Sequence, residues 1–427
     1  MDPSRNAPIS YGYTQLSIFD RRSPYIDIVI VVLPLVAILF NRLLGPIAPL
    51  LVLSTTPLYI LLRWERIYGV IKSSWPLLLL PLFALASVFW SDEPARTVRY
   101  GFLYFLTVLP AVFIGAGCSR DALLKGIFIA FAIYMFMSLP FGRWVSWGGP
   151  GGRAFAGLLG SKNASGDLAG LTVLCATTII FWSLERKQFV WLATAVAVLF
   201  CGLFTLWASK ATGALVATII AFPCLILWIL SRNVKTEVRT VIFMLAILVV
   251  VGAVSTMTFW MEPIFDALLE SSGKDAGLTG RDVLWQKADQ LILERPFIGG
   301  GYNAFWVHNN LDAEYLWREM GIATRKGFNF HNTPRDILVD LGFVGLGLFV
   351  LVVFYAASRL ILRAMLDPSF SGILCCTLLV FESPRIFFEL IGFQNIHFGT
   401  LIVFVILSYG LRPSNHAEIG GNLKSEY

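Results

Sequence analysis

Repeated apolar stretches of about twenty residues constrain the fold of this chain more than any other feature. Hydrophobic residues make up 57% of its 427 residues, charged residues 14%, and the mean hydropathy is +0.72. A soluble domain carries about 25% charged residues, so polar side chains are too few here to cover a water-soluble globule. The sequence therefore predicts an integral membrane protein.

Twelve segments meet or approach the length that crosses a bilayer, so we predict an all-α, polytopic membrane protein with about 12 transmembrane helices. The weakest, near 46–62, is short and contains three prolines. The prediction divides the chain into a tail (1–24), nine spans (25–260), a large helical loop (261–335), three spans (336–411) and a second tail (412–427). The spans run near 25–44, 46–62, 75–91, 100–117, 122–140, 164–183, 189–207, 211–230, 240–260, 336–358, 370–388 and 395–411.

The basic residues between these spans predict the orientation. If both termini are cytoplasmic, about 17 of the 33 basic residues face inwards, and the short outer loops hold only about 8. The positive-inside rule therefore favours cytoplasmic termini and a long loop on the outer, periplasmic side. Loops of about 75 residues are far longer than a connector and usually carry function. Apolar spacing over Leu284–Leu293 predicts a helix in this loop, and we expect a small helical lid at the membrane surface.

Outward-facing basic residues are the candidates for binding an anion. Arg153 and Lys162 lie in the glycine-rich stretch GGPGGRAFAGLLGSKNASG, where backbone amides can approach a ligand closely. Lys210 lies in a very short loop between two apolar spans, where a cation is costly without an anionic partner. Arg281 is expected at the start of the lid helix. Each alone is more often a solvated side chain, but together they favour phosphate, either on a transported ligand or on a lipid substrate.

His331 ends the long loop and leads into Pro334 and Arg335 at the next span. Histidine is the side chain best suited to take a proton near neutral pH, so His331 is the candidate base; the alternative is an interfacial histidine that satisfies backbone groups. His308, His397 and His416 are assigned structural roles. No HExxH, DxD or P-loop pattern occurs, so we expect no metal, cofactor or ATP hydrolysis. The net charge of +6 is accounted for by cytoplasmic loops and implies no nucleic acid.

A reaction outside the membrane without nucleotide or metal requires a pre-activated substrate, such as a lipid-linked sugar pyrophosphate. The run LTGRDVLWQKADQLILERPFIGGGYNAFW, followed by FNFHNTPRDILVDLGFVGLG, resembles the O-antigen ligase/Wzy polymerase superfamily. Within it, the nearest likeness is to exopolysaccharide polymerases of the ExoQ type, with their TGR, RPxxGxGxxAFW and HNxxL segments. The resemblance implies a GT-C-like fold in the bacterial inner membrane. It also implies metal-independent, inverting transfer from an undecaprenyl-pyrophosphate-linked glycan.

The resemblance also implies roles for individual residues. His331 matches the base, Arg281 matches the arginine of the TGR motif, and Ser209–Lys210 lies where the family has Ser–Arg. Lys162–Asn163 resembles the family's HKN segment, and Arg335 is included as a further substrate contact. The substrate-binding set is thus Arg153, Lys162, Lys210, Arg281 and Arg335, while Asp340 is expected to orient the loop.

Three functions remain open from the sequence. The leading one is polymerisation of repeat units into a surface exopolysaccharide, and its competitor is ligation of O-antigen to lipid A–core. A transporter or flippase for the precursor is the alternative of another class. Expected partners are the lipid-linked oligosaccharide and membrane lipids, together with flippase and chain-length or export proteins.

Overall fold

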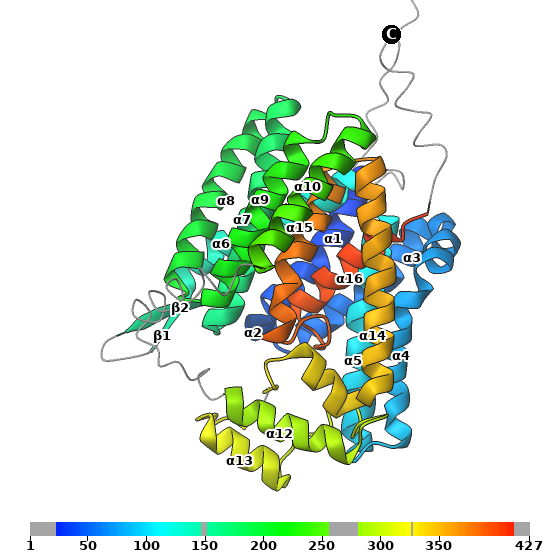
Figure 1. Cartoon of the computed structure of the whole chain (residues 1–427), viewed down its shortest axis with the longest axis vertical. Coiled ribbons are helices and arrows are strands. Elements are labelled where there is room, and N and C mark those ends of the chain that lie inside the picture. The colour runs from blue at the N-terminus through cyan, green and yellow to red at the C-terminus, as the bar shows by residue number, and fades with distance from the viewer. Residues whose placement is uncertain (1–22, 147–151, 256–280, 326–327, 414–427) are drawn as a thin grey trace, which may run out of the picture.

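The computed structural model describes residues 23–146, 152–255, 281–325 and 328–413 (Figure 1). As predicted, the chain is an all-α bundle; the described part adds one small pair of strands, β1 (Arg143–Ser146) and β2 (Arg153–Gly157). Short 3₁₀ turns cover Trp75–Leu78 (η1), Ser87–Phe89 (η2) and Pro384–Phe387 (η3). The helices are α1 (Pro24–Leu39), α2 (Asn41–Leu44), α3 (Ile47–Ser74), α4 (Leu79–Ala86), α5 (Pro94–Gly117), α6 (Arg120–Phe141), α7 (Lys162–Glu185), α8 (Phe189–Ala208), α9 (Thr212–Leu230), α10 (Thr236–Ser255), α12 (Arg281–Glu294), α13 (Leu311–Glu319), α14 (Thr333–Leu366), α15 (Phe370–Glu382) and α16 (Phe398–Gly410).

Within the described residues, eight helical segments are long and apolar enough to cross a membrane. One of them, Ile47–Phe89, has 43 residues, which is enough for two crossings of about 20 residues each. Helices α1 and α16 are apolar but shorter. The prediction of a polytopic membrane protein is confirmed, whereas the count of twelve spans stays a prediction.

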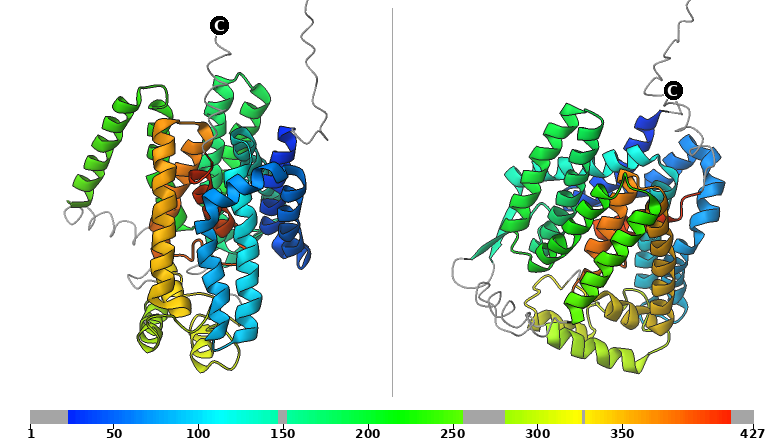
Figure 2. Two further views of the ribbon diagram at one scale, coloured as in Figure 1. Left: turned by 90° about the vertical axis from the view of Figure 1, so that its right-hand side faces the viewer. Right: turned by 45° about the horizontal axis from the view of Figure 1, so that its top comes forward.

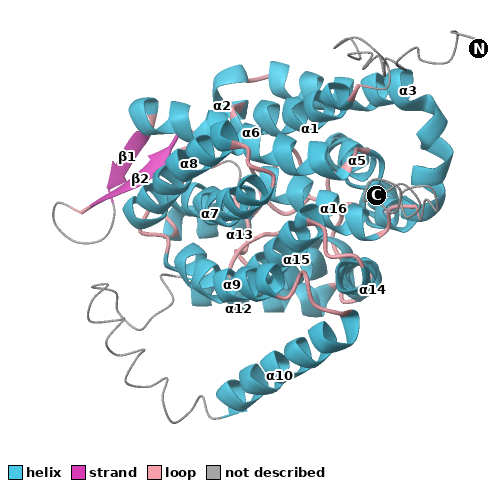
Figure 3. Cartoon of the chain, turned by 90° about the horizontal axis from the view of Figure 1, so that it is seen from above, coloured by secondary structure: helices cyan, strands magenta, loops and turns pink. Residues whose placement is uncertain are grey.

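The bundle has a buried centre and an exposed apolar periphery. The most apolar windows of α5, α6, α7 and the α15–η3 segment are 67–78% buried, and all thirteen residues of α16 are buried. The corresponding windows of α8, α9, α14 and Ile47–Phe89 are only 28–39% buried. Apolar side chains that face outwards in this way are suited to lipid. Figure 3 shows α16 within the ring of helices and α10 apart at the edge.

Helix α3 corrects one detail of the predicted topology. The sequence suggested a loop after residue 62, because basic residues follow it, but the helix continues to Ser74 and only breaks its regular geometry at Arg63 (φ −134°, ψ 31°). The Arg63 side chain is 1% exposed; its Nε donates to Asp27 Oδ1 of α1 at 2.8 Å, and its Nη2 donates to the Ser23 carbonyl at 2.9 Å. The basic residue is therefore paired inside the bundle, which removes the need for a loop there.

The last two helices, α15 and α16, are short. Each has 13 residues, or about 20 Å of helix at 1.5 Å per residue. The predicted span 370–388 therefore stops as an α-helix at Glu382 and continues as the 3₁₀ turn η3. Between α15 and α16 lies an irregular segment, residues 383–397, which we call the α15–α16 loop. Such backbone is tolerated within a membrane bundle only where protein or water surrounds it.

Helices α12 and α13 form a lid (residues 281–332) at one end of the bundle, as the two views of Figure 2 show. The predicted helix at Leu284–Leu293 is confirmed by α12, and Arg281 is its first residue. The lid has a hydrophobic core that is separate from that of the bundle and also includes Val339 of α14. This core includes Leu284, Ala288, Phe305, Trp306, Leu316, Trp317 and Phe330.

The lid is hydrogen-bonded into a break in α14. At Gly342 the helix adopts φ +64° and ψ −166°, a conformation suited to glycine. The segment 296–301 lies in this break: the amides of Phe343 and Val344 donate to the carbonyls of Pro296 and Phe297, at 2.7 and 3.1 Å. In return the Gly300 amide donates to the Val339 carbonyl at 2.9 Å. Lid and α14 therefore share one hydrogen-bonded network.

Candidate active site

Four segments meet at the lid: the starts of α7, α12 and α14, and the α15–α16 loop. Glu389 of that loop lies at the centre. Its Oε1 accepts hydrogen bonds from Asn163 Nδ2 of α7 at 3.0 Å and from Arg281 Nη2 of α12 at 3.2 Å. Its Oε2 lies 3.2 Å from Nδ1 of His331. One carboxylate therefore joins the two residues that the sequence singled out, although they are fifty residues apart in the chain.

His331 is held in a strained backbone conformation. Its φ is +50°, in the left-handed region that costs non-glycine residues free energy. Its amide donates to Asn329 Oδ1 at 2.8 Å, and its ring meets Phe328 edge-on at 5.5 Å. The side chain remains 25% exposed. A fixed ring with one open side is suited to proton transfer with a ligand.

The two residues after His331 attach it to the α15–α16 loop. Asn332 caps α14 by accepting from the Arg335 amide at 3.0 Å, and its Nδ2 donates to the Phe387 carbonyl at 3.0 Å. Thr333 Oγ1 donates to the Glu389 carbonyl at 2.8 Å and accepts from the Ile391 amide at 2.7 Å. The sequence His–Asn–Thr thus fixes the imidazole against the carboxylate.

The electrostatics of the cluster keep Glu389 ionised. Burial alone raises the pKa of this carboxyl, but the hydrogen bond to His331 and the charges of His331, Arg281 and Arg385 outweigh it, so the pKa lies below its ordinary value. An ionised carboxylate only accepts hydrogen bonds, so Nδ1 of His331 carries the hydrogen between them. When the imidazole is neutral, its free electron pair is therefore on Nε2.

Arg385 and its two carboxylate partners form a second charged group close to Glu389. Arg385 of η3 is 4% exposed and forms ion pairs with Asp167 of α7 and with Glu382 of α15, the latter at 2.6 Å. It therefore fixes the start of α7 against the end of α15. Nearby, Nδ1 of His397 caps α16 by accepting from the Gly399 amide at 3.2 Å, which is a structural role.

The other predicted binding residues fall into two groups. Lys162 is the first residue of α7, directly before Asn163. Lys210 has φ +53°, and its ammonium lies 4.5 Å from the centre of the Trp207 ring. The turn that contains it packs on α7, since a Cβ on Gly166 would lie 2.4 Å from that of Ala211. Both lysines therefore lie beside the first turns of α7.

Arg153 and Arg335 have other surroundings. Arg153 is exposed on β2, which pairs with β1, so this part of the glycine-rich stretch is a strand; residues 147–151 lie outside the described part. Arg335 binds Asp289 of α12 through two hydrogen bonds of 2.8 and 3.1 Å and lies over the Trp285 ring at 4.9 Å. It connects the lid to α14. Asp340 contacts the loop as expected, since its Oδ2 accepts from the Asn303 amide at 2.8 Å.

Comparison with known proteins places this site in a family context. Residues 197–350 match the O-antigen ligase family (Wzy_C). The likeness extends beyond that region: the chain is 28% identical over 349 residues to the exopolysaccharide production protein ExoQ of Rhizobium meliloti (strain 1021). That alignment covers 81% of this chain and 79% of the relative. The resemblance recognised in the sequence is thereby confirmed.

The O-antigen ligase region contains four predicted site residues, Lys210, Arg281, His331 and Arg335. Glu389 lies outside it, as do Arg385 and Asp167, and the sequence did not indicate their roles. A signal was available: RIFFEL places two charged residues in an otherwise apolar stretch between the last two spans, where a charge requires a partner. No group of three or more His, Cys, Asp or Glu residues within the described ranges is arranged to hold a metal ion.

Proposed function

We propose that this chain is a glycosyltransferase that polymerises undecaprenyl-pyrophosphate-linked repeat units into a surface exopolysaccharide. The reaction takes place at the periplasmic face of the bacterial inner membrane, with both termini in the cytoplasm. The observation that supports this best is the contact of His331, at the end of the lid, with Glu389, while Arg281 is bound to the same carboxylate. A base, its orienting carboxylate and a cation are the groups that transfer from a sugar pyrophosphate requires.

His331 acts as the general base in this proposal. Its Nδ1 donates a hydrogen bond to Glu389, so Nε2 accepts the proton of the acceptor sugar hydroxyl. The hydroxyl oxygen forms a bond to the anomeric carbon of the donor as the bond from that carbon to the pyrophosphate oxygen breaks. A single displacement inverts the anomeric configuration. Glu389 is a positioning residue, since it fixes the tautomer and stabilises the imidazolium that forms.

The leaving pyrophosphate takes the electron pair of the broken bond and is stabilised by cations. A guanidinium has five N–H donors, and Arg281 donates one hydrogen bond from Nη2 to Glu389. Its other N–H groups can donate to phosphate oxygens. Lys162 and Lys210, beside the first turns of α7, are the additional cations. Positive side chains supply this stabilisation without a bound metal ion.

The relative's name, an exopolysaccharide production protein, favours polymerisation over ligation. Donors arrive on the outer leaflet through a flippase, and chain-length and export proteins take the product. Ligation of glycan to lipid A–core uses the same groups, because the acceptor alone differs. Transport is disfavoured by the location of the cluster, which lies at one end of the bundle under the lid.

The decisive experiment supplies purified full-length protein with a defined lipid-linked repeat unit. We expect a ladder of lengthened, lipid-linked products and release of undecaprenyl pyrophosphate in equal amount. Protein in liposomes that carries the repeat unit across the bilayer but never lengthens it would show a transporter and refute the proposal.

Deletion of the gene distinguishes polymerase from ligase. Loss of high-molecular-weight exopolysaccharide with unchanged lipopolysaccharide banding is expected for the polymerase. Unchanged exopolysaccharide with loss of the lipopolysaccharide ladder would identify the ligase instead.

A further inference from the structure

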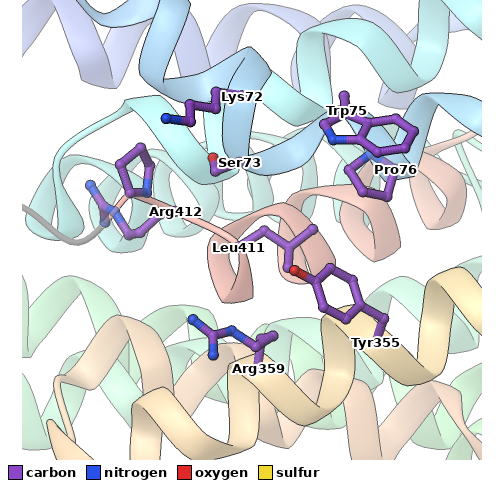
Figure 4. A pocket seen from close by; sticks show the side chains of 9 residues that line it. Lys72, Ser73, Trp75, Pro76, Tyr355, Arg359, Leu411 and Arg412 are labelled. Carbon is purple, nitrogen blue, oxygen red and sulfur yellow. The ribbon is translucent and has the colours of Figure 1, made fainter.

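A cavity of about 450 Å³ (Figure 4) lies near the end of α3, at the end of the bundle opposite the lid in Figure 1. It is formed where the end of α3 and the turn η1 approach α14 and the segment after α16. Its basic lining residues are Lys72, Arg359 and Arg412, and its aromatic ones are Trp75 and Tyr355. Figure 4 shows that Arg359 and Tyr355 project from α14 towards the residues of α3 and of the segment after α16. Three cations from three separate parts of the chain therefore line one cavity.

The charge of this cavity is not balanced by the described residues. No aspartate or glutamate is among its described lining residues, and none of the three cations forms a salt bridge within the described part of the chain. Three like charges around one cavity repel each other unless an anion lies between them.

Arg412 adds an independent indication of a ligand. The residue is only 8% exposed, and its Nη2 donates to the Cys118 carbonyl at 2.6 Å. Its Nη1 is buried and has no hydrogen-bond partner among the described atoms. A buried charged donor without an acceptor is costly, and a phosphate oxygen is the acceptor that suits a guanidinium best.

The surroundings distinguish a lipid from a soluble anion. Trp75 and Tyr355 are 53% and 48% exposed, as aromatic residues are at a membrane interface. Along α14, next to Tyr355, the apolar side chains Leu351 and Phe354 are also exposed. An acyl chain can lie on this face of α14 while its phosphate lies among the cations. Basic cavities between transmembrane helices are known sites for anionic headgroups.

We propose that this cavity binds the phosphate of an anionic phospholipid headgroup, in the leaflet opposite the lid. The lipid occupies a site separate from the proposed donor site, and its binding does not depend on the reaction proposed above. It connects α3, α14 and the end of α16, which are otherwise held together here by few polar contacts between side chains.

The test uses delipidated full-length protein in a neutral detergent, titrated with phosphatidylglycerol. Bound lipid is counted by native mass spectrometry, and the melting temperature is followed in parallel. A basic residue near a headgroup contributes a factor of about five in affinity. The double variant Lys72→Gln/Arg359→Gln is therefore expected to bind about 25-fold more weakly, and Arg359→Lys to bind nearly as well as the wild type. Arg412 is not substituted, because its Nη2 also donates a hydrogen bond to the Cys118 carbonyl.

Controls identify the ligand. Lys235→Gln removes an exposed lysine in the turn between α9 and α10, outside the cavity, and is expected to bind like the wild type. Equal binding of phosphatidylcholine, or unweakened phosphatidylglycerol binding by the double variant, would overturn the proposal. Equal stabilisation by inorganic phosphate at the same concentration would also overturn it, because the ligand would then be a free anion and not a lipid.

Discussion

The two ends of the molecule use basic residues in opposite ways. Beneath the lid, Arg281, Arg385 and Arg335 each bind a carboxylate. In the cavity at the other end, Lys72, Arg359 and Arg412 line a space without any described carboxylate. A paired cation holds other groups in position, and a cation without a carboxylate is available to an anion. This difference supports the two proposals made above, a reaction site beneath the lid and a binding site at the opposite end.

The largest effect is expected for His331→Ala. Loss of a general base reduces rates by about 10²–10⁴-fold, so the variant should yield almost no polymer while inserting at normal levels. The in vitro extension rate and the amount of protein in membranes measure this. His308→Ala is the matched control, because His308 is an exposed lid histidine beside Glu314, and it should retain wild-type rates. Normal polymer from His331→Ala would remove His331 as the base.

Glu389→Gln tests whether the central carboxylate orients the base. Removing such an orienting partner costs about 10–100-fold in activity, and Glu389→Asp should restore part of it. The extension rate should fall with little change in the KM for the lipid-linked donor, because Glu389 does not contact the donor. If Glu389→Gln raised only the KM for the donor and left the maximal extension rate unchanged, Glu389 would instead act in substrate binding, through Arg281.

The same carboxylate predicts how stability depends on pH. Its folded-state pKa is below the ordinary value of 4.5, so ionised Glu389 stabilises the fold fully above that value. This stabilisation is lost as the pH falls towards the lowered pKa. The difference in melting temperature between wild type and Glu389→Gln should therefore be constant from pH 7 to about 5 and shrink below that. A difference that grows on acidification would contradict the assignment.

Substitutions in the cavity at the opposite end should have little effect on the extension rate. Lys72→Gln/Arg359→Gln should change the extension rate in detergent by less than about twofold, since surface changes away from a site have small effects. The same assay as for His331→Ala measures it. A loss of the size expected for His331→Ala would mean that the two ends are coupled and that the distinction between them is wrong.

The smallest effect is expected for Arg335→Ala. The partly exposed pair with Asp289 contributes at most about 1 kcal/mol to stability, and Arg335 contacts the lid instead of Glu389. A double-mutant cycle with Asp289→Ala, read by melting temperature, should show coupling between the two residues. A strong loss of activity in Arg335→Ala but not in Asp289→Ala would return Arg335 to the substrate-binding set.

Local patterns in the sequence predicted the lid helix and its first residue well. The apolar spacing of Leu284–Leu293 reports a local periodicity, and α12 has it. The topology predicted that His331 and Arg281 lie on the same side, and both bind Glu389. Glu389 could not be found in this way, because its 58-residue separation from His331 and 108-residue separation from Arg281 are bridged only by tertiary packing.

Two errors have the same physical origin. Arg63 indicated a loop, but its pairing with Asp27 allows α3 to continue. The glycines near Arg153 favoured irregular backbone, but residues 153–157 form a strand, in which Phe155 pairs with Trp144. Arginine alone favours a solvated position, and glycine alone favours irregular backbone. In both cases pairing with a residue distant in the sequence had the larger effect, and a single sequence does not reveal such pairing.

The break of α14 at Gly342 has a consequence for engineering and for evolution. The Cβ of any side chain at this position would meet the Phe297 carbonyl group at 2.2–2.3 Å, and the lid's main chain completes the hydrogen bonding of the interrupted helix. The lid is thus not a detachable module. A chimera that exchanges lids between relatives must bring its own first half of α14 with it, so the two segments should be inherited and redesigned as one unit.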